Sequence, residues 1–518
     1  MKFFNFKLRS FIAVLLALVF LGFMVFTAGA AAGESDEGPF GIVLTWQNSP
    51  QETMSMTWWT EEEEDSFIYY TSDDGAERDE FEMTQANTWT AEEAEDWIHG
   101  GEITGLEPDT EYRAFVTTGD EYSEKFTFQT APEDSREINF IAGGDSRTNI
   151  EDRREINRRA AELEPEFVLF AGDLVESPNI TEEKWQSWVR DWSQLMVTEE
   201  GRRIPVIPAV GNHEIDGASY HASREEVPFY FDSFLLPGNE KYFTLDYGPD
   251  LTLLTLDSDH TSEVYDSPQY DWLNKTLPAI ESDWIVTQYH VPGWTSQRPV
   301  YYDTARRIRD HWVPLFEEHG VDMVNEAHDH TYKVTERIDG VSEFRADMAG
   351  WIEEGMERAE EDYDPEEDYT PWSFPELSEL SGGSWDEVEG IDNRLEAIAA
   401  LPYYTSLYLM QEEGELTFEM VFEEVADTTL HNEMWDNLPE YYDIKDEEGI
   451  LYVGDGAWGA PLRTADEPDE RWYLQDSATQ YNFYEMNLNP EEQRLEVVPH
   501  VWEDKEEWIE MDSFTVEQ

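Results

Sequence analysis

Short apolar runs of strand length recur through the middle of the chain, and each leads into a polar turn. Because they are short and bounded by turn residues, they are predicted to be buried strands. They span residues 138–141, 167–170, 204–210, 284–286 and 321–324. Between them apolar residues also recur at helical spacing, as Ile156, Ala160 and Leu163 do. Helices are therefore predicted over residues 152–163, 182–195 and 267–277, which makes this part of the chain an α/β (α+β layered) domain.

The pattern before residue 137 differs, because strand-like runs follow one another without intervening helices. They lie at residues 54–59, 66–70, 112–118 and 125–130. This spacing predicts an all-β domain over residues 38–132, with a linker at residues 130–134. Two roles remain open for the domain, which are packing and spacing on the one hand and ligand binding on the other.

The first residues of the chain have the order of a secretory signal. Lys2, Lys7 and Arg9 precede an apolar run over residues 11–26, and small residues follow it. The run is short for a membrane-spanning helix, and no cysteine follows it to carry a lipid. We therefore expect residues 1–32 to be a signal peptide and the protein to be secreted, extracellular or at the cell surface. A retained N-terminal anchor is the alternative, and no other membrane contact is expected.

The charge balance narrows the choice of partners. The chain has 117 acidic against 33 basic residues and a formal net charge of -84. Such a surface repels nucleic acid and anionic membranes, so neither is expected as a partner. The acidic residues are spread through every segment, which is typical of halophilic proteins, since salt screens self-repulsion. An acidic protein from an ordinary habitat is the alternative. A rare basic cluster on the first predicted helix is interpreted as intramolecular pairing, and consists of Arg153, Arg154, Arg158 and Arg159.

The ends of the five predicted strands carry side chains that bind metals. In chain order these are Asp145, Asp173, Asn212, His213, His290, His328 and His330. Carboxylate, amide and imidazole ligands together suit borderline divalent metals better than calcium. A carboxylate whose two oxygens bridge is what a close pair of metal ions requires. Each histidine taken alone is equally well explained as a structural residue, but five such strand ends in one chain predict a metal site.

These residues stand in motifs that resemble those of the calcineurin-like metallophosphoesterases, in the order of that family. The motifs are Gly144-Asp145, Gly172-Asp173-Leu174, Gly211-Asn212-His213-Glu214, His290-Val291-Pro292 and His328-Asp329-His330. Residues 105–112 resemble the corner of a fibronectin type III domain, where a tyrosine bonds back to the backbone. Similarity to the purple acid phosphatase branch is carried by that N-terminal domain and by residues 243–248, 454–460 and 511–514. The resemblance implies a metallophosphoesterase sandwich over residues 137–340 and 448–518, preceded by a fibronectin type III-like domain.

The resemblance also implies a role for each strand-end residue. Asp173 is expected to bridge two metal ions, which would be divalent or trivalent Fe, Mn or Zn. The expected ligands are Asp145 and His330 for the first ion, and Asn212, His290 and His328 for the second. A metal-bound hydroxide would attack phosphorus. His213 would lie over the leaving group as an acid or charge stabiliser.

Two positions near the first metal ion depart from the family pattern. Glu176 stands where the purple enzymes have a tyrosine, and Arg147 stands where the wider family often has a histidine. Glu176, Asn149 or water are the candidates to complete the ligands of this ion. Arg147 cannot coordinate a metal, but its guanidinium is expected to clamp a phosphate oxygen of the substrate.

Residues 341–447 form an acidic insertion that the family does not usually have. Residues 353–375 are acidic and contain prolines, while residues 405–411 and 415–422 are predicted to form a hairpin. The insertion would either cover the rim of the active site or extend the surface away from it.

The expected function is hydrolysis of small phosphate esters by a secreted phosphomonoesterase of the purple acid phosphatase kind. A phosphodiesterase or nucleotidase of the same superfamily is the alternative among enzymes. A non-catalytic surface-binding protein with a structural metal site is the alternative outside them. His213 favours an enzyme, since a structural metal site has no use for an imidazole that binds no metal.

Overall fold

The computed structural model describes three parts of the chain. These are residues 38–362 with gaps at 92–93, 178–179, 216–226, 228, 260–263 and 300–302, scattered positions between 402 and 444, and residues 449–518. The predicted signal peptide lies outside them. Within these described parts, no helix combines the length and the apolar character needed to cross a membrane.

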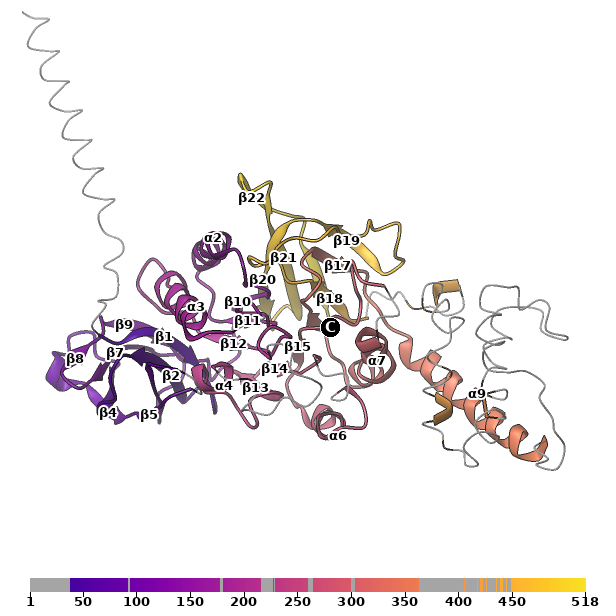
Figure 1. Cartoon of the computed structure of the whole chain (residues 1–518), viewed down its shortest axis with the longest axis horizontal. Helices are drawn as coiled ribbons and strands as arrows, with labels where there is room; N and C mark the ends of the chain where they lie inside the picture. Colours follow the sequence, from indigo (N-terminus) through magenta and orange to yellow (C-terminus); the bar gives the residue numbers. More distant parts are fainter. Residues whose placement is uncertain are drawn as a thin grey trace, which may run out of the picture.

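The N-terminal domain is a sandwich of two antiparallel sheets, as the strand pattern predicted (Figure 1). One sheet has the order β1-β2-β6-β5, from Phe40–Thr45, Thr53–Thr60, Trp97–Thr104 and Asn87–Trp89. The other has the order β4-β3-β7-β8 with β9 beside β7, from Glu82–Gln85, Ser66–Thr71, Glu111–Thr118, Glu121–Tyr122 and Phe126–Gln129. The Tyr112 hydroxyl accepts a hydrogen bond from Glu107 N at 2.9 Å, so the tyrosine corner expected from the sequence is present.

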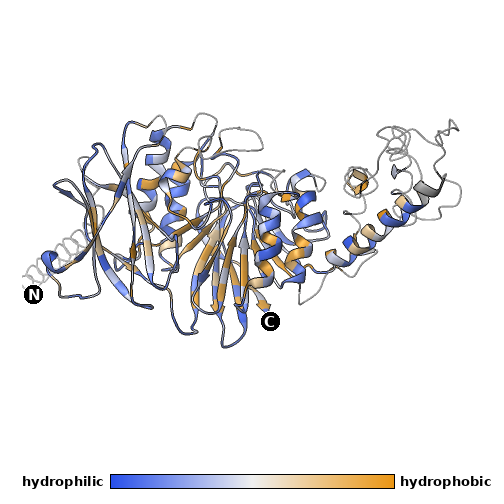
Figure 2. Cartoon of the chain, turned by 90° about the horizontal axis from the view of Figure 1, so that it is seen from below, coloured by the Kyte–Doolittle hydropathy of each residue, from blue (hydrophilic) through white to orange (hydrophobic). Residues whose placement is uncertain are grey.

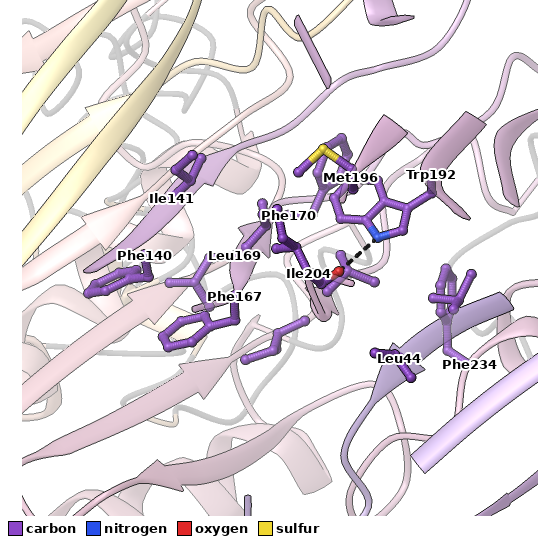
Figure 3. Packing of buried hydrophobic residues seen from close by; sticks show 14 of the residues in the cluster. Leu44, Phe140, Ile141, Phe167, Leu169, Phe170, Trp192, Met196, Ile204 and Phe234 are labelled. Carbon is purple, nitrogen blue, oxygen red and sulfur yellow. Dashed lines mark hydrogen bonds between the residues drawn. The ribbon is translucent and has the colours of Figure 1, made fainter. Parts of the chain in front are cut away.

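The first of these sheets packs against the domain that follows. Ile42 N donates to Ser193 Oγ at 3.1 Å, and Thr57 Oγ1 donates to Ser233 O at 2.6 Å. Every residue of β2 is buried, because its two faces lie against the sandwich interior and the next domain. Figure 3 shows Leu44 of β1 in the same hydrophobic cluster as strands of that next domain. The N-terminal sandwich is therefore a packed part of the molecule.

Two seven-stranded sheets form the core of the second domain (Figure 1). The first has the order β12-β11-β10-β20-β21-β22 with β23 beside β21, and the second has the order β13-β14-β15-β16-β18-β17-β19. The first consists of Val206–Pro208, Val168–Phe170, Ile138–Gly143, Tyr481–Asn489, Arg494–Glu503, Glu507–Glu510 and Phe514–Glu517. The second consists of Phe243–Tyr247, Leu251–Thr255, Trp284–Gln288, Met323–Asn325, Leu451–Gly454, Tyr332–Thr335 and Leu474–Ala478. Figure 2 shows these strands as mainly hydrophobic, which is expected of sheets covered on their faces.

The five predicted strands divide between the two sheets. β10, β11 and β12 pair in parallel in the first sheet, while β15 and β16 pair in parallel in the second, next to β14 and β18. The carboxyl ends of both parallel groups carry the predicted metal-binding residues. The sheet order thus decides which loops face one another.

The three predicted helices are present. They are α2 Ile150–Ala161, α3 Glu182–Leu195 and α6 Pro268–Thr276, and the domain also contains α4 Tyr230–Ser233, α7 Asp303–His311 and α8 Val313–Glu318. Helix α3 begins after Thr181, whose side chain accepts a hydrogen bond from Lys184 N. Helix α6 begins after Ser267, whose side chain accepts one from Tyr270 N. These capping bonds satisfy backbone donors that the first turn leaves unpaired.

The basic cluster on α2 pairs within the protein, as predicted. Arg154 Nε donates to Asp191 Oδ1 on α3 at 2.8 Å, and Arg153 Nε donates to Asp191 Oδ2 at 3.1 Å. Arg158 and Arg159 pair with carboxylates of their own helix region, both at 3.2 Å. The cluster therefore joins α2 to α3.

The insertion opens on a helix, α9 Val341–Asp362, which was not predicted from the sequence and includes the start of the acidic stretch over residues 353–375. Phe344, Met348 and Ile352 of this helix are buried in a second hydrophobic cluster that includes Trp435. In Figure 1, α9 points away from the two sheets. This buried apolar face explains why an acidic stretch forms a helix here.

The predicted hairpin is wrong at the positions that the structure describes. Thr405, Ser406 and residues 420–422 are helical, while the rest of both segments lies outside the described residues, apart from Thr417. Short apolar runs do not distinguish strand from helix by periodicity alone, and here burial against α7 and α9 decides.

Candidate metal centre

The predicted ligand residues meet where the two parallel strand groups end. They are Asp145, Asp173 and Asn212 after β10, β11 and β12, and His290, His328 and His330 after β15 and β16. Ligand atoms of two groups lie within 4.8 Å of one another, namely Asp173 with His290 and His328, and Asp145 with Asp173 and His330. Asp173 belongs to both groups, so one carboxylate stands between them.

Several hydrogen-bond acceptor atoms lie close together at this point, and there are too few donor hydrogens between them to form hydrogen bonds. His330 Nε2 lies 3.2 Å from Asp145 Oδ1, and His290 Nε2 lies 3.3 Å from Asp173 Oδ1. Asn212 Oδ1 lies 3.2 Å from His290 Nε2. Among the residues that the structure describes, the buried Asp145 Oδ1 has no hydrogen-bond partner. A buried acceptor without a donor is costly, whereas metal ions would satisfy all of these atoms, so the donor set fits them.

Backbone carbonyls orient two of the imidazoles. His290 Nδ1 donates to Ala171 O, and His330 Nδ1 donates to Pro461 O, both at 2.8 Å. Because a carbonyl only accepts, Nδ1 carries the proton and Nε2 presents its lone pair to the centre. Burial lowers the pKa of His330 to about 4 and lowers the pKa of His328 well below its usual value. These two histidines are therefore neutral near pH 7, which is the state that binds metal.

The loops that carry the ligands require unusual backbone geometry. The φ angle is positive at Asp145, Asp173, His328 and His330, with values of 58°, 56°, 76° and 58°. A Cβ at Gly211 would lie 2.3 Å from Asp173 N, so only glycine permits this approach of two loops.

Glu214, whose role the motif alone did not reveal, holds the same two loops together. Its buried carboxylate accepts hydrogen bonds from Gly211 N at 2.7 Å and from Asp173 N and Leu174 N at 2.8 Å. Three backbone donors on one carboxylate fix its position and theirs. Glu214 is therefore a positioning residue for Asp173.

His213 lies beside the centre and belongs to neither group of ligand atoms. Ser177 N donates to His213 Nδ1 at 2.9 Å. A backbone N–H only donates, so Nδ1 is the acceptor and neutral His213 carries its proton on Nε2. This Nε2 lies 3.8 Å from Asp173 Oδ2, and the side chain is 15% exposed. The imidazole thus presents a donor to whatever lies over the centre.

Arg147 lies inside the centre, where it contacts carboxylates. Its Nε donates to Asp173 Oδ2 at 3.1 Å, and its Nη1 donates to Glu176 Oε2 at 3.0 Å. Its Nη2 lies 3.2 Å from His330 Nε2. The sequence predicts that Arg147 clamps a phosphate oxygen, and in the structure two carboxylates hold its guanidinium at the centre. Glu176, one of the candidate spare ligands, faces Arg147.

Asn149, the other candidate spare ligand, is the residue before α2. Its Nδ2 donates to Tyr481 Oη at 3.0 Å. Its role as a metal ligand stays a prediction.

The segment after β18 crosses the metal-binding loops, and we call residues 456–463 the strap. A Cβ at Gly456 would lie 1.7 Å from Asp145 Oδ2, so the strap needs glycine to pass this carboxylate. At its other end Arg463 N donates to His330 O at 3.2 Å. In the sequence this segment is marked by the motif over residues 454–460 and its glycines.

Two family models match the chain. Residues 139–332 match "Calcineurin-like phosphoesterase", and residues 39–130 match "Purple acid Phosphatase, N-terminal domain". The purple acid phosphatase of Glycine max is 28% identical over 264 residues, which are 48% of this chain and 54% of the relative. The Fe(3+)-Zn(2+) purple acid phosphatase 12 of Arabidopsis thaliana is 26% identical over 263 residues, again 48% and 54%. The chain thus spans about half the length of these curated relatives.

Solved structures extend the similarity to the fold. A purple acid phosphatase from yellow lupin (Lupinus luteus) seeds superposes with a TM-score of 0.60 at 14% identity, over 93% of this chain and 74% of that chain. At this identity the match speaks for the fold alone, and it agrees with both family models. This chain therefore carries a calcineurin-like phosphoesterase domain behind a purple acid phosphatase N-terminal domain.

Proposed function

We propose that this chain is a secreted, metal-dependent hydrolase of small phosphate esters that acts as a phosphomonoesterase. The observation that carries the proposal is that Asp173 is shared by two groups of ligand atoms. A carboxylate between two sets of ligands is the arrangement that two-metal phosphoryl hydrolysis needs. The relatives named purple acid phosphatases support the choice of a monoester. Secretion rests on the basic, apolar and small-residue order of residues 1–32.

Two metal ions, divalent or trivalent Fe, Mn or Zn, are the proposed cofactors. Their ligands would be Asp145 and His330 for the first, Asn212, His290 and His328 for the second, and Asp173 for both. Bound there, the ions would lower the pKa of water and neutralise negative charge on a phosphoryl group. The relative named for Fe(3+) and Zn(2+) supports iron and zinc among these metals.

Three further residues have tasks of their own in this proposal. His213 would donate a hydrogen bond from Nε2 to the departing alcohol oxygen and stabilise its charge, because its Nδ1 is occupied by Ser177 N. Arg147 would exchange its contact with Glu176 for a phosphate oxygen. Glu214 would keep Asp173 in place through its backbone contact.

A panel of esters tests the proposal. The purified protein is loaded with Mn, Zn or Fe, its metal content is measured, and a chromogenic phosphomonoester is compared with the analogous diester. We expect faster hydrolysis of the monoester and about two metal ions per chain. Faster hydrolysis of the diester would favour the phosphodiesterase or nucleotidase. Tight metal binding with no hydrolysis of either ester would favour the non-catalytic surface-binding protein.

The folded state is expected to be less stable in dilute buffer than in concentrated salt. The chain has a net charge of -84 and no cysteine, so no disulfide opposes self-repulsion. At about 1 M salt the screening length falls to about 3 Å, and the repulsion falls with it. The melting temperature is measured across a salt series, with an uncharged osmolyte at equal osmolality as the control. Equal melting temperatures in dilute and concentrated salt would contradict the proposed halophilic character.

The iron-loaded protein is expected to lack a strong visible charge-transfer band. In the family it resembles, that band comes from a tyrosinate on ferric iron, and Glu176 occupies the matching position. Glu176 pairs with Arg147 at 3.0 Å. The visible spectrum of the iron-loaded protein is compared with that of a Glu176→Tyr variant, which is expected to gain absorbance. An intense purple band in the unmodified protein would show that the ligands of the first ion are wrongly assigned.

A further inference from the structure

Two more arginines lie at the edge of the metal centre, on loops that contact the histidine ligands. Arg463, at the end of the strap, donates from its backbone N to His330 O at 3.2 Å and from Nη1 to His328 O at 3.3 Å. Its guanidinium is thereby held beside the loop that carries both histidines. Arg298, on the loop after β15, approaches Asp329 Oδ1 with Nε at 3.2 Å.

Arg463 is unusual because, among the described residues, no carboxylate lies within ion-pair distance of its guanidinium. Among the residues that the structure describes, it forms no ion pair with a carboxylate, and its one side-chain contact is with a backbone carbonyl. The chain has 117 acidic residues against 33 basic ones, so an arginine without an acidic partner is unexpected at random. It is only partly buried, so its remaining donors are open to a ligand.

The two guanidiniums flank the loop that carries the histidine ligands. Arg463 Nη1 donates to His328 O, and Arg298 Nε lies 3.2 Å from Oδ1 of the next residue, Asp329. Asp329 is held in place from its other oxygen, which accepts hydrogen bonds from Ser296 N at 3.0 Å and Gln297 N at 3.1 Å. Two guanidiniums at the edge of the metal centre can therefore donate to an anionic group that extends beyond the metal-binding loops.

We propose that Arg463 and Arg298 form a subsite for a second anionic group of the substrate, a carboxylate or a further phosphate, next to the scissile phosphate. The inference rests on the proposed function and specifies its substrate class as phosphate esters with an additional negative charge. The planar fork of a guanidinium matches either anionic group. On a surface that otherwise repels anions, such a local reversal of charge would also select where they bind.

A matched pair of substrates tests the proposal. Glycerol 3-phosphate has a neutral hydroxymethyl group where 3-phosphoglycerate has a carboxylate, and the two esters are otherwise alike. Inorganic pyrophosphate is the third probe and carries a second phosphate. The metal-loaded protein is expected to show higher kcat/KM for the two charged probes. Arg463→Gln is expected to lower kcat/KM for them by about 10- to 100-fold, mainly through KM, and to lower it much less for glycerol 3-phosphate.

The control variant is Arg158→Gln, which removes the same charge from α2, where Arg158 pairs with Glu155 at 3.2 Å. It is expected to leave both kinetic constants as in the parent protein. Metal content is measured for every variant. Arg463→Lys keeps the positive charge without the planar guanidinium, and it is expected to lower kcat/KM for the charged probes by an intermediate factor. It replaces Arg463→Gln if that variant does not fold.

Equal losses for the neutral and the charged esters would overturn the subsite and leave the proposed function standing. The subsite would equally be overturned if Arg463→Gln and Arg158→Gln behaved alike. Hydrolysis of none of the three probes by the metal-loaded parent protein would instead overturn the proposed function, and the subsite with it. If Arg463→Gln lowers kcat/KM for pyrophosphate alone, the subsite binds a phosphate group. If it lowers kcat/KM for 3-phosphoglycerate alone, the subsite binds a carboxylate.

Discussion

Replacing Asp173 by asparagine should abolish turnover and reduce the metal content of the protein. Its carboxylate belongs to both groups of ligand atoms, so among the described residues no other single side chain serves two ions. An amide has one neutral oxygen and cannot neutralise two cations. We expect a loss of at least about 10³-fold in kcat/KM and fewer than two bound ions per chain, measured by elemental analysis alongside the ester assay.

The matched control for this variant is Asp134→Asn, which makes the same chemical change at an exposed position in the linker. It is expected to keep full activity and metal content. Burial raises the pKa of Asp173, but His290, His213 and Arg147 lower it by more, so the charge stabilises the fold and the folding of Asp173→Asn is checked by circular dichroism. Near-normal hydrolysis with two ions bound would rule out Asp173 as the shared ligand.

Replacing His213 by alanine should slow catalysis and leave the metals in place. His213 is in neither group of ligand atoms, and Ser177 N fixes its tautomer so that Nε2 carries a proton. Loss of a positioned acid lowers kcat by about 10²–10⁴-fold. The loss should be smaller for an ester whose leaving group is a good anion, because such a group needs no proton. The loss of rate in His213→Ala is measured for a nitrophenyl ester and for an alkyl ester, and the metal content of the variant is measured alongside.

His319→Ala is the control for that experiment. His319 follows α8 and precedes β16, so it lies at the amino end of the strand whose carboxyl end carries His328. It is expected to have no effect on either ester. If His213→Ala releases a metal ion, then His213 is a ligand and the assignment of an acid is wrong.

The elements that could be predicted from the sequence are those decided by local periodicity. The strand runs before Asp145 and Asp173 and the helix over Glu182–Leu195 appear where the spacing of apolar residues placed them. The tyrosine corner could also be predicted, because Tyr112 and its partner Glu107 N are five residues apart. In each case the residues that determine the structure lie close together in the sequence.

What the sequence did not predict correctly depends on contacts between residues that are far apart in the chain. The segment over residues 420–422 is helical because it packs on distant helices, which its own apolar pattern does not reveal. Likewise, only the fold shows that Asn149 Nδ2 donates to Tyr481 Oη and that Glu176 lies against Arg147.

The chemistry available at the centre follows from the chain alone, because ligand types and their order at strand ends are properties of the sequence. The charge of the surface and the absence of disulfides follow from it in the same way. Which loops face one another depends on the folded arrangement, since five strand ends divide between two sheets. Only that arrangement shows that Asp173 is shared by two groups, that Glu214 ties two loops, and that Arg463 stands beside the histidines without an acidic partner in the described chain. Such contacts join residues far apart in sequence, and no local pattern encodes the distance between them.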